Sequence, residues 1–194
     1  MVRLMFSDTE KENILRVKSK LTRLSTGFHF KYVFKPDRLL TSAFDSAFIS
    51  GGAIGSLLRG EEPNDYDMYF QMDPFVDVKT FIELEKDNIM TTVEHYRNRG
   101  GNVLDDEKGT PLITENAITM KDKLQLIYKS YGTPDQIRKT FDYIHCMPYY
   151  SIGEDKLYIS KEQYDLCIYK VLKINNRSSY SKYREEKFKK RGWV

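Results

Sequence analysis

The chain has 194 residues, a net charge of +3, 40% hydrophobic residues and 30% charged residues. These values are ordinary for a globular domain with a sizeable core, and they exclude a wholly disordered chain. Its apolar runs all fall short of the ~20 residues of a membrane helix. The apolar start over 1–6 is too short for a signal peptide. We therefore expect a cytoplasmic protein without membrane contact, in which Cys146 and Cys167 are free thiols.

The positive charge is concentrated near the C-terminus. From Lys173 to Val194 there are eight basic and two acidic residues, a net charge of +6. The preceding 172 residues carry 23 basic and 26 acidic residues, a net charge of −3. Such a tail favours contact with phosphates. A solvated helix face would give the same pattern, so both interpretations stay open.

The first periodic segment predicts an amphipathic helix over residues 8–24. Ser7 and Glu10 have the spacing of a capping box, in which each side chain accepts a hydrogen bond from the other residue's amide. Apolar residues then recur on one helical face: Ile14, Val17, Leu21 and Leu24. Alternation over 28–34 predicts a strand, and residues 36–47 have the spacing of a second helix opened by a proline.

The rest of the chain alternates between short strands and helices, which indicates an α+β fold with a mixed β-sheet and helices packed on it. In chain order we expect a strand at 47–50, a helix at 52–58, a strand at 66–71, a helix at 74–87, a loop at 96–110, a hairpin of 112–120 with 124–128, a helix from Pro134, strands at 141–147 and 156–159, and helices at 161–174 and 179–190.

A diglycine at the start of a helix is the first candidate for a ligand site. The strand that ends at Ser50 runs into Gly51 and Gly52, and a helix follows at once. Glycine lets the backbone approach a ligand closely, and the free amides at a helix start carry partial positive charge. This arrangement suits a triphosphate.

Paired carboxylates follow the diglycine. Asp65 and Asp67 are two residues apart on the next predicted strand, so both side chains project from one face. Such a pair can share two divalent cations in phosphoryl or nucleotidyl transfer. A third carboxylate is expected from a neighbouring strand, and Asp142, flanked by apolar residues, is the preferred candidate. Its rivals are Glu115 in the hairpin and the acidic cluster at 105–107.

This combination resembles the polymerase-β-like nucleotidyltransferase superfamily. The stretch GGAIGSLLRGEEPNDYDMYF, residues 51–70, is similar to the head domain of CCA-adding enzymes and bacterial poly(A) polymerases. The resemblance departs at Gly55-Ser56, where CCA-adding heads carry Arg-Asp, and the chain lacks room for the helical neck and body that hold tRNA. The short format is similar to the small nucleotidyltransferases of phages, which would act in the host cytoplasm.

The resemblance implies a nucleotidyltransferase palm with two Mg²⁺ ions, Mn²⁺ being an alternative, and a nucleoside triphosphate. Asp65 and Asp67 would hold both ions, and Asp142 would hold the ion that activates the acceptor hydroxyl. Gly51 and Gly52 would cradle the phosphates. Three further residues are expected to contact the phosphates: Ser56, Lys170 and Lys173.

Some of these residues also have a purely structural interpretation. Lys170 and Lys173 are equally compatible with a solvated helix face. Tyr180 and Tyr183 are able to stack on a base, but their spacing is more typical of core residues. His145 is expected to be buried in the strand at 141–147 rather than to act as a ligand.

The predicted organisation is a catalytic domain over 1–150 with a C-terminal helical extension over 151–194 in the same compact unit. The predicted reaction is attack of an acceptor hydroxyl on the α-phosphorus of a nucleoside triphosphate, with ATP as the default donor and pyrophosphate as the product. Protein, small-molecule and nucleotide acceptors are open beside an RNA 3′ end. The alternative from another class is a non-catalytic protein of this fold that binds nucleic acid or a host protein.

The basic tail is the reason to favour RNA as the acceptor, because phosphate contacts dominate nucleic-acid binding. If the tail packs against the palm instead, Phe188 and Trp193 should be buried. That outcome would remove the preference for RNA and favour a protein or a small molecule.

Overall fold

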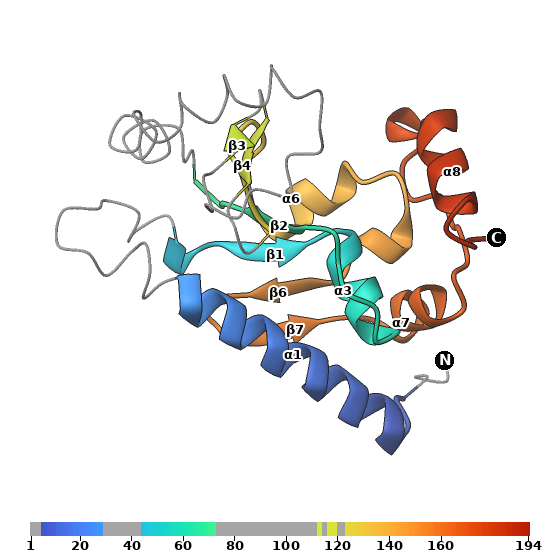
Figure 1. The fold of residues 1–194 in the computed structure, drawn as a ribbon, viewed down its shortest axis with the longest axis horizontal. Coiled ribbons are helices and arrows are strands. Elements are labelled where there is room, and N and C mark those ends of the chain that lie inside the picture. Colours follow the sequence, from blue (N-terminus) through green and yellow to red (C-terminus); the bar gives the residue numbers. More distant parts are fainter. Residues whose placement is uncertain (1–4, 29–43, 73–111, 114–115, 120–122) are drawn as a thin grey trace, which may run out of the picture.

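The structure is a computed structural model, and it describes residues 5–28, 44–72, 112–113, 116–119 and 123–194 (Figure 1). The elements are α1 (Asp8–Phe28), β1 (Phe48–Ser50), α3 (Gly52–Leu58), β2 (Tyr66–Tyr69), β3 (Leu112–Ile113), β4 (Ala117–Thr119), β5 (Leu124–Ile127), α6 (Pro134–Lys139), the 3₁₀ turn η3 (Ile144–Cys146), β6 (Tyr149–Ser151), β7 (Lys156–Tyr158), α7 (Lys161–Ile168), the 3₁₀ turn η4 (Arg177–Ser179) and α8 (Lys182–Lys189).

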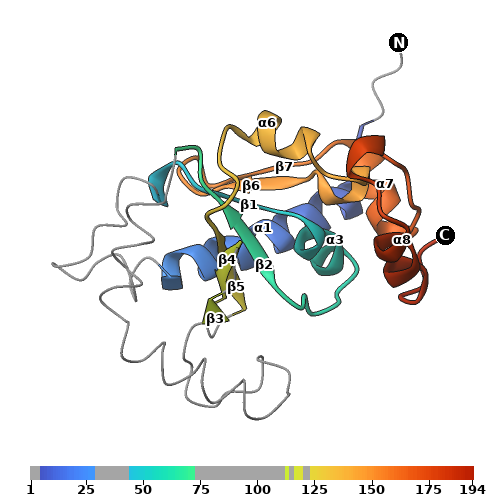
Figure 2. The ribbon, with the colours of Figure 1, turned by 90° about the horizontal axis from the view of Figure 1, so that it is seen from above.

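The described strands form a seven-stranded mixed sheet in the order β3-β4-β5-β2-β1-β6-β7. Strands β2 and β5 pair in parallel, and every other pair of neighbours in this sheet is antiparallel. Figure 2 shows α1 on one side of β1, β6 and β7, and α6 on the other. The predicted α+β class, a mixed sheet with helices packed on it, is confirmed.

Local sequence signals set several helix starts. Ser7 and Glu10 exchange the hydrogen bonds of the predicted capping box at the start of α1. Thr133 and Gln136 do the same at α6, which begins at Pro134 as predicted. These boxes satisfy amides that have no partner inside the helix. Helix α1 continues to Phe28, past the predicted end at residue 24.

The core lies where α1 and α3 pack on the centre of the sheet. Val17 and Leu21 on α1 join Ile54 on α3 and the strand residues Ile49 and Met68 in one buried cluster. Strand β1 is paired on both edges, and all three of its residues are buried. The diglycine therefore follows a strand that is buried throughout and paired on both edges, which holds its position firmly.

Three predicted elements differ from the structure. The stretch 112–120 is two strands, β3 and β4, which pair with each other, while β4 and β5 form the predicted hairpin. The predicted strand at 141–147 is wrong, because only Tyr143 makes an isolated bridge and η3 follows it. The predicted helix at 161–174 ends at Ile168.

Other predictions lie outside the described residues. They are most of the strand at 28–34 and of the helix at 36–47, the helix at 74–87, the loop at 96–110 and the rival carboxylates Glu115 and 105–107. The predicted domain boundary at residue 150 falls inside β6, so the sheet takes strands from both predicted parts. In the part of the chain that the structure describes, no helix is long and apolar enough to cross a bilayer.

Candidate functional site

The turn between β1 and α3 brings the backbone against a carboxylate. Gly51 has a φ of +93°, a conformation that side chains with a β-carbon rarely adopt. A β-carbon built on Gly51 would lie 2.7 Å from Oδ2 of Asp67, whereas one on Gly52 would meet no atom within 4 Å. The Gly51 amide donates to the carbonyl of Cys146 at 3.0 Å, which ties the turn to η3. Position 51 therefore requires glycine, and position 52 keeps open space beside it.

Asp67 is a poorly compensated carboxylate. It lies within β2 and is half-buried, and its side chain has no hydrogen bond or ion pair with any of the described residues. Burial, and then the negative charge of Asp65, raise the pKa of Asp67 to about 7, while Arg184 and Lys187 oppose the rise. A carboxylate in this state gains most from a cation that approaches it.

Asp65 lies one residue before the start of β2 and is half-buried. Its charge acts on Asp67, so the two carboxylates are electrostatic neighbours as the spacing predicted. They open on adjoining pockets, and Gly52 borders both. Oxygen donors with uncompensated negative charge are the ligands that Mg²⁺ prefers, so the chemistry of this pair fits a divalent cation.

Asp142 does not lie on a strand adjacent to β2, contrary to the prediction. The residues in register with Asp67 on the flanking strands are Ser50 and Gln125, and neither is acidic. Asp142 sits at a bend before η3, where its carbonyl accepts hydrogen bonds from the amides of Asn175 at 2.7 Å and Asn176 at 3.3 Å. The chain after α7, rather than a sheet, holds this residue.

The Asp142 carboxylate is paired with Arg184 of α8. The side chain of Asp142 is 4% exposed, and both of its oxygens accept hydrogen bonds from the guanidinium, from Nε and, at 3.2 Å, from Nη2. Arg184 was not singled out by the sequence, since nothing but the basic character of the tail marks it. Its partner lies far away in the chain and is found only from the fold.

One pocket of about 300 Å³ is lined by four of the eight candidate site residues. This Asp67 pocket is lined by the diglycine, by two carboxylates and by a guanidinium: Gly51, Gly52, Asp67, Asp142 and Arg184. Among the described residues, however, no three His, Cys, Asp or Glu side chains gather closely enough to form a metal site. The pocket thus brings Asp67 and Asp142 together, while Asp65 lines a second pocket, so the three predicted carboxylates do not form one ligand set.

A second pocket of about 250 Å³ adjoins the first. This Lys170 pocket contains the other predicted phosphate ligands except Lys173: Gly52, Ser56 and Lys170, together with Asp65 and Arg191. Lys170 lies beyond the end of α7, and its ammonium contacts Glu61 at 3.1 Å and donates to the carbonyl of Arg191 at 3.1 Å. Lys173 also lies past α7 and pairs with Glu162 instead.

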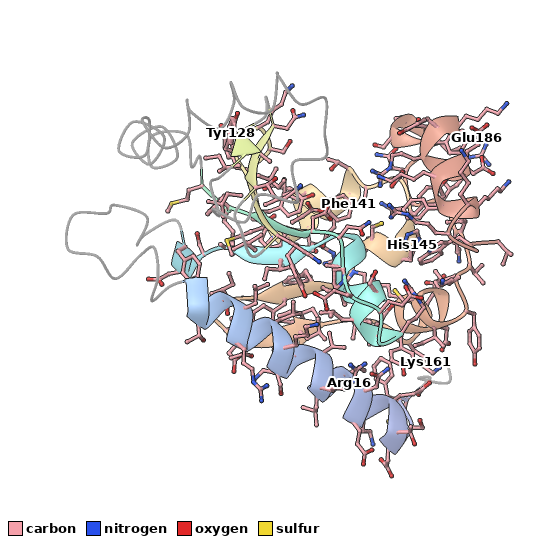
Figure 3. All side chains as sticks on the ribbon, in the orientation of Figure 1. Arg16, Tyr128, Phe141, His145, Lys161 and Glu186 are labelled. Carbon is pink, nitrogen blue, oxygen red and sulfur yellow. The ribbon has the colours of Figure 1, made fainter. Side chains whose placement is uncertain are left out.

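The end of the chain packs against the site. Trp193 is 6% exposed, and its ring lies 3.9 Å from that of His145, centroid to centroid. The half-buried Phe188 contacts the same imidazole edge-on at 4.8 Å. In Figure 3 His145 lies between α3 and α8. The structure therefore follows the second expectation for the tail, in which it packs against the palm, although Phe188 is only partly covered.

His145 is buried as predicted, at 1% exposure, but in η3 rather than in a strand. Both tyrosines of the tail are exposed, Tyr180 at 39% and Tyr183 at 75%, so the prediction that they belong to the core is wrong. Tyr183 borders a shallow basic surface with Lys187, Lys190 and Arg191. Cys146 and Cys167 are free and buried, in agreement with the sequence.

Comparison with known proteins finds a family to which this chain belongs and a relative from a phage. Residues 16–165 match the Gabija anti-defense 2 family. The chain belongs to this family. A protein named Gabija anti-defense 2, from Bacillus phage SPbetaL7, is 25% identical over 137 residues, which are 70% of this chain and 30% of that protein. The chain therefore spans less than a third of the length of this relative.

The fold of this family member is similar to that of a solved nucleotidyltransferase. The Thermotoga maritima CCA-adding enzyme, solved in complex with tRNA, superimposes with a TM-score of 0.51 and 16% identity, over 98% of this chain and 43% of that one. This similarity confirms the predicted fold, that of the head domain of CCA-adding enzymes. At this identity it bears on the fold alone.

Proposed function

We propose that the chain is a metal-dependent nucleotidyltransferase that moves a nucleoside monophosphate from a nucleoside triphosphate, ATP by default, to an acceptor hydroxyl with release of pyrophosphate. The observation that carries this proposal is the contact between Gly51 and Asp67. A glycine with positive φ leaves room for a carboxylate that has no partner among the described residues, at the mouth of a pocket. Stability alone does not explain such a group, because an unpaired half-buried charge is destabilising.

The residues divide between two tasks. Asp65 and Asp67 would hold two divalent cations, Mg²⁺ or Mn²⁺, whose chemistry when bound is to offset the charge of the phosphates and polarise the α-phosphorus. Asp142, in the same pocket as Asp67, would hold the ion that activates the acceptor hydroxyl once its carboxylate is free of Arg184. Asp67 on its buried strand would fix the distance between donor and acceptor.

The Lys170 pocket suits the rest of the triphosphate. Gly52 adds no side chain to either pocket, and Ser56 and Lys170 line the second one with Arg191. Ammonium and guanidinium groups stabilise phosphate oxygens, most strongly where water is partly excluded. A triphosphate bridging the two pockets at Gly52 would have its α-phosphorus near Asp67.

The acceptor we favour is a protein of the host's defence machinery. The docking of Trp193 and Phe188 on His145 removes the argument for RNA that rested on a free basic tail. The Gabija anti-defense name of the family and of its phage relative supports a target in the host. Modification of a hydroxyl on such a target would account for both the fold and the name.

Label transfer tests the proposal. The purified chain is incubated with Mg²⁺ and ATP labelled at the α-phosphate, in a lysate of a host that carries Gabija defence. We expect a labelled product with wild type and with Asp135→Asn, an exposed carboxylate of α6, but none with Asp67→Asn. ATP labelled at the γ-phosphate should give no label that depends on the added chain, because this phosphate leaves with pyrophosphate. Protease or nuclease digestion of the α-labelled product identifies the acceptor class. Equal labelling by wild type and Asp67→Asn would overturn the assignment.

A non-catalytic binding protein is the second candidate, and one observation favours it. Asp142 is engaged by Arg184, and no three-carboxylate group forms among the described residues. A chain that acts by binding alone would still protect the phage, in a host with Gabija defence, when Asp67 is replaced by asparagine. Loss of protection in this variant, with unchanged folding, would exclude the binding-only function.

A further inference from the structure

The Asp67 pocket contains its own cation. Arg184 lines this pocket with Asp67 and Asp142, and its guanidinium bonds both oxygens of the buried Asp142 carboxylate. Its positive charge also acts on Asp67, as one of two cations that oppose the rise of the Asp67 pKa. The Arg184 guanidinium therefore faces Asp67 and Asp142, the two carboxylates of this pocket that a divalent cation would use.

A docked segment, rather than a loose tail, delivers Arg184. At the very end of the chain, the amide of Val194 donates to the carbonyl of Lys170 at 2.8 Å, and its carbonyl accepts from the amide of Leu172 at 2.6 Å. Trp193 packs on His145 and lies under the guanidinium of Arg59, 5.1 Å from its carbon. These contacts anchor the segment that follows α8, so Arg184 reaches the pocket while this segment is docked.

Helix α8 itself is held lightly. None of its residues is buried, and the side chain of Arg184 remains 48% exposed even while it pairs with Asp142. Few buried contacts oppose a local opening, so a helix of this kind belongs to the less stable parts of a fold. Arg184 can therefore leave Asp142 without unfolding the sheet.

We infer that Arg184 and a divalent cation compete for Asp142, so that Arg184 occupies the acceptor side of the site until metal and substrate displace α8. This inference rests on the proposed function, because it takes Asp142 to be a metal ligand. A dication bound to Asp142 would repel a guanidinium on the same oxygens, and the two cannot share this carboxylate at contact distance. Displacement of α8 frees Asp142 and also leaves the guanidinium free to contact a phosphate.

Binding of Mn²⁺ alone, without nucleotide, tests the competition by calorimetry on the full chain. Arg184→Gln should bind Mn²⁺ about tenfold more tightly than wild type, since a charge-assisted pair no longer has to be broken. The matched control is Lys189→Gln, which removes a cation from the same helix, where it pairs with Glu185. This control should change the affinity less than about twofold, as expected of a surface pair. Adding Asp142→Asn to Arg184→Gln should cancel the gain.

A variant that retains the charge covers the case in which Arg184→Gln folds poorly with Asp142 left unpaired. Arg184→Lys keeps a cation beside the buried carboxylate but loses the two-pronged contact, so its Mn²⁺ affinity should lie between those of wild type and Arg184→Gln. A purely structural role for Arg184 would lower stability in both variants without raising metal affinity.

The outcomes separate the two proposals. Tighter Mn²⁺ binding in Arg184→Gln that depends on Asp142 supports the competition. Equal Mn²⁺ affinity in wild type, Arg184→Gln and Arg184→Lys overturns the competition and leaves the proposed function standing. If neither wild type nor any variant binds Mn²⁺, and Asp67→Asn transfers label from ATP as wild type does, the metal-dependent function is wrong. The proposed competition is then wrong as well.

Discussion

The imidazole of His145 lies against the indole of Trp193, with ring centroids 3.9 Å apart and planes inclined by 32°. Two more aromatic rings enclose the imidazole, and neither ring nitrogen has a hydrogen-bond partner among the described residues. Burial, followed by the positive charges of Arg59 and Arg184, lowers the pKa of His145 to about 3. The C-terminal segment is therefore docked on a histidine that stays neutral in the folded protein.

The first prediction follows from this pKa. Below about pH 6.5 the unfolded chain binds a proton at His145 that the folded chain does not, so stability falls as pH falls towards 3. We expect this histidine to reduce the free energy of unfolding by up to about 1.4 kcal/mol per pH unit in that window. Urea denaturation at pH 7 and pH 4.5 measures the change.

The His145→Phe variant isolates that contribution. Phenylalanine keeps an aromatic ring against Trp193 and removes both unpaired nitrogens, so the variant should equal or exceed wild type in stability at pH 7. Its advantage over wild type should grow as pH falls, because only wild type carries the histidine penalty. A difference between the two proteins that does not change with pH would contradict a buried neutral histidine.

The second prediction separates the two glycines of the turn. Gly51→Ala combines a φ of +93° with a β-carbon 2.7 Å from Asp67, so it should destabilise the fold by about 1–3 kcal/mol. Gly52→Ala meets no atom, so stability should change little, but its methyl group enters the space between the two pockets. We expect about tenfold weaker ATP binding in this variant from steric overlap alone, measured by calorimetry.

Gly60→Ala is the matched control. Gly60 also has a positive φ, +76°, but a β-carbon there would meet nothing within 4 Å. It should therefore report the backbone strain without the contact with Asp67. If Gly51→Ala were no more destabilised than Gly60→Ala, the contact would contribute nothing. Unchanged ATP binding in Gly52→Ala would show that the phosphates of ATP do not lie against Gly52.

The site could be predicted from the sequence where its signals are local. The strand into Gly51-Gly52, the helix after it and the carboxylates at Asp65 and Asp67 lie within one short stretch, and each element depends on its own residues. Position 51 was predicted for its freedom of conformation. The carboxylate of Asp67, which makes glycine necessary there, is brought close by the tertiary structure and not by the local sequence.

Asp142 shows where local patterns fail. The alternation of apolar residues over 141–147 is typical of a strand, yet it arises from a bridge to Ile174 followed by a 3₁₀ turn in which His145 is covered by the tail. Asp142 has partners from a distant part of the chain. Asn175 donates to its carbonyl, and Arg184 pairs with its carboxylate. No periodicity within a short window reports such contacts.

The third prediction concerns the charge of Asp67. Its folded pKa of about 7 lies above the ordinary value of 3.8, so the ionised group destabilises the fold most above pH 7, and the penalty fades as pH falls and the folded protein takes up a proton. Asp67→Asn should therefore be more stable than wild type by about 1–3 kcal/mol at pH 8. At pH 5 that gain should be smaller.

Thermal denaturation at the two pH values checks this expectation. Asp135→Asn serves as the control, because the Asp135 side chain is 83% exposed and its replacement should give a small difference that does not depend on pH. If Asp67→Asn were less stable than wild type at pH 8, Asp67 would have a stabilising partner, and the case for a cation at this carboxylate would be lost.

The last prediction concerns the exposed cations of the tail. Three of them line neither the Asp67 pocket nor the Lys170 pocket and are replaced together by glutamine: Lys187, Lys189 and Lys190. Because Trp193 and the Val194 backbone dock the segment, the variant should fold as wild type does. It should also label its protein acceptor to a similar extent. Any RNA binding by wild type should be weak, and its affinity should fall with salt concentration by about 0.7 log units per phosphate contacted. This binding should be lost in the variant. If wild type labels RNA and the variant does not, the tail instead presents an RNA acceptor to the Asp67 pocket.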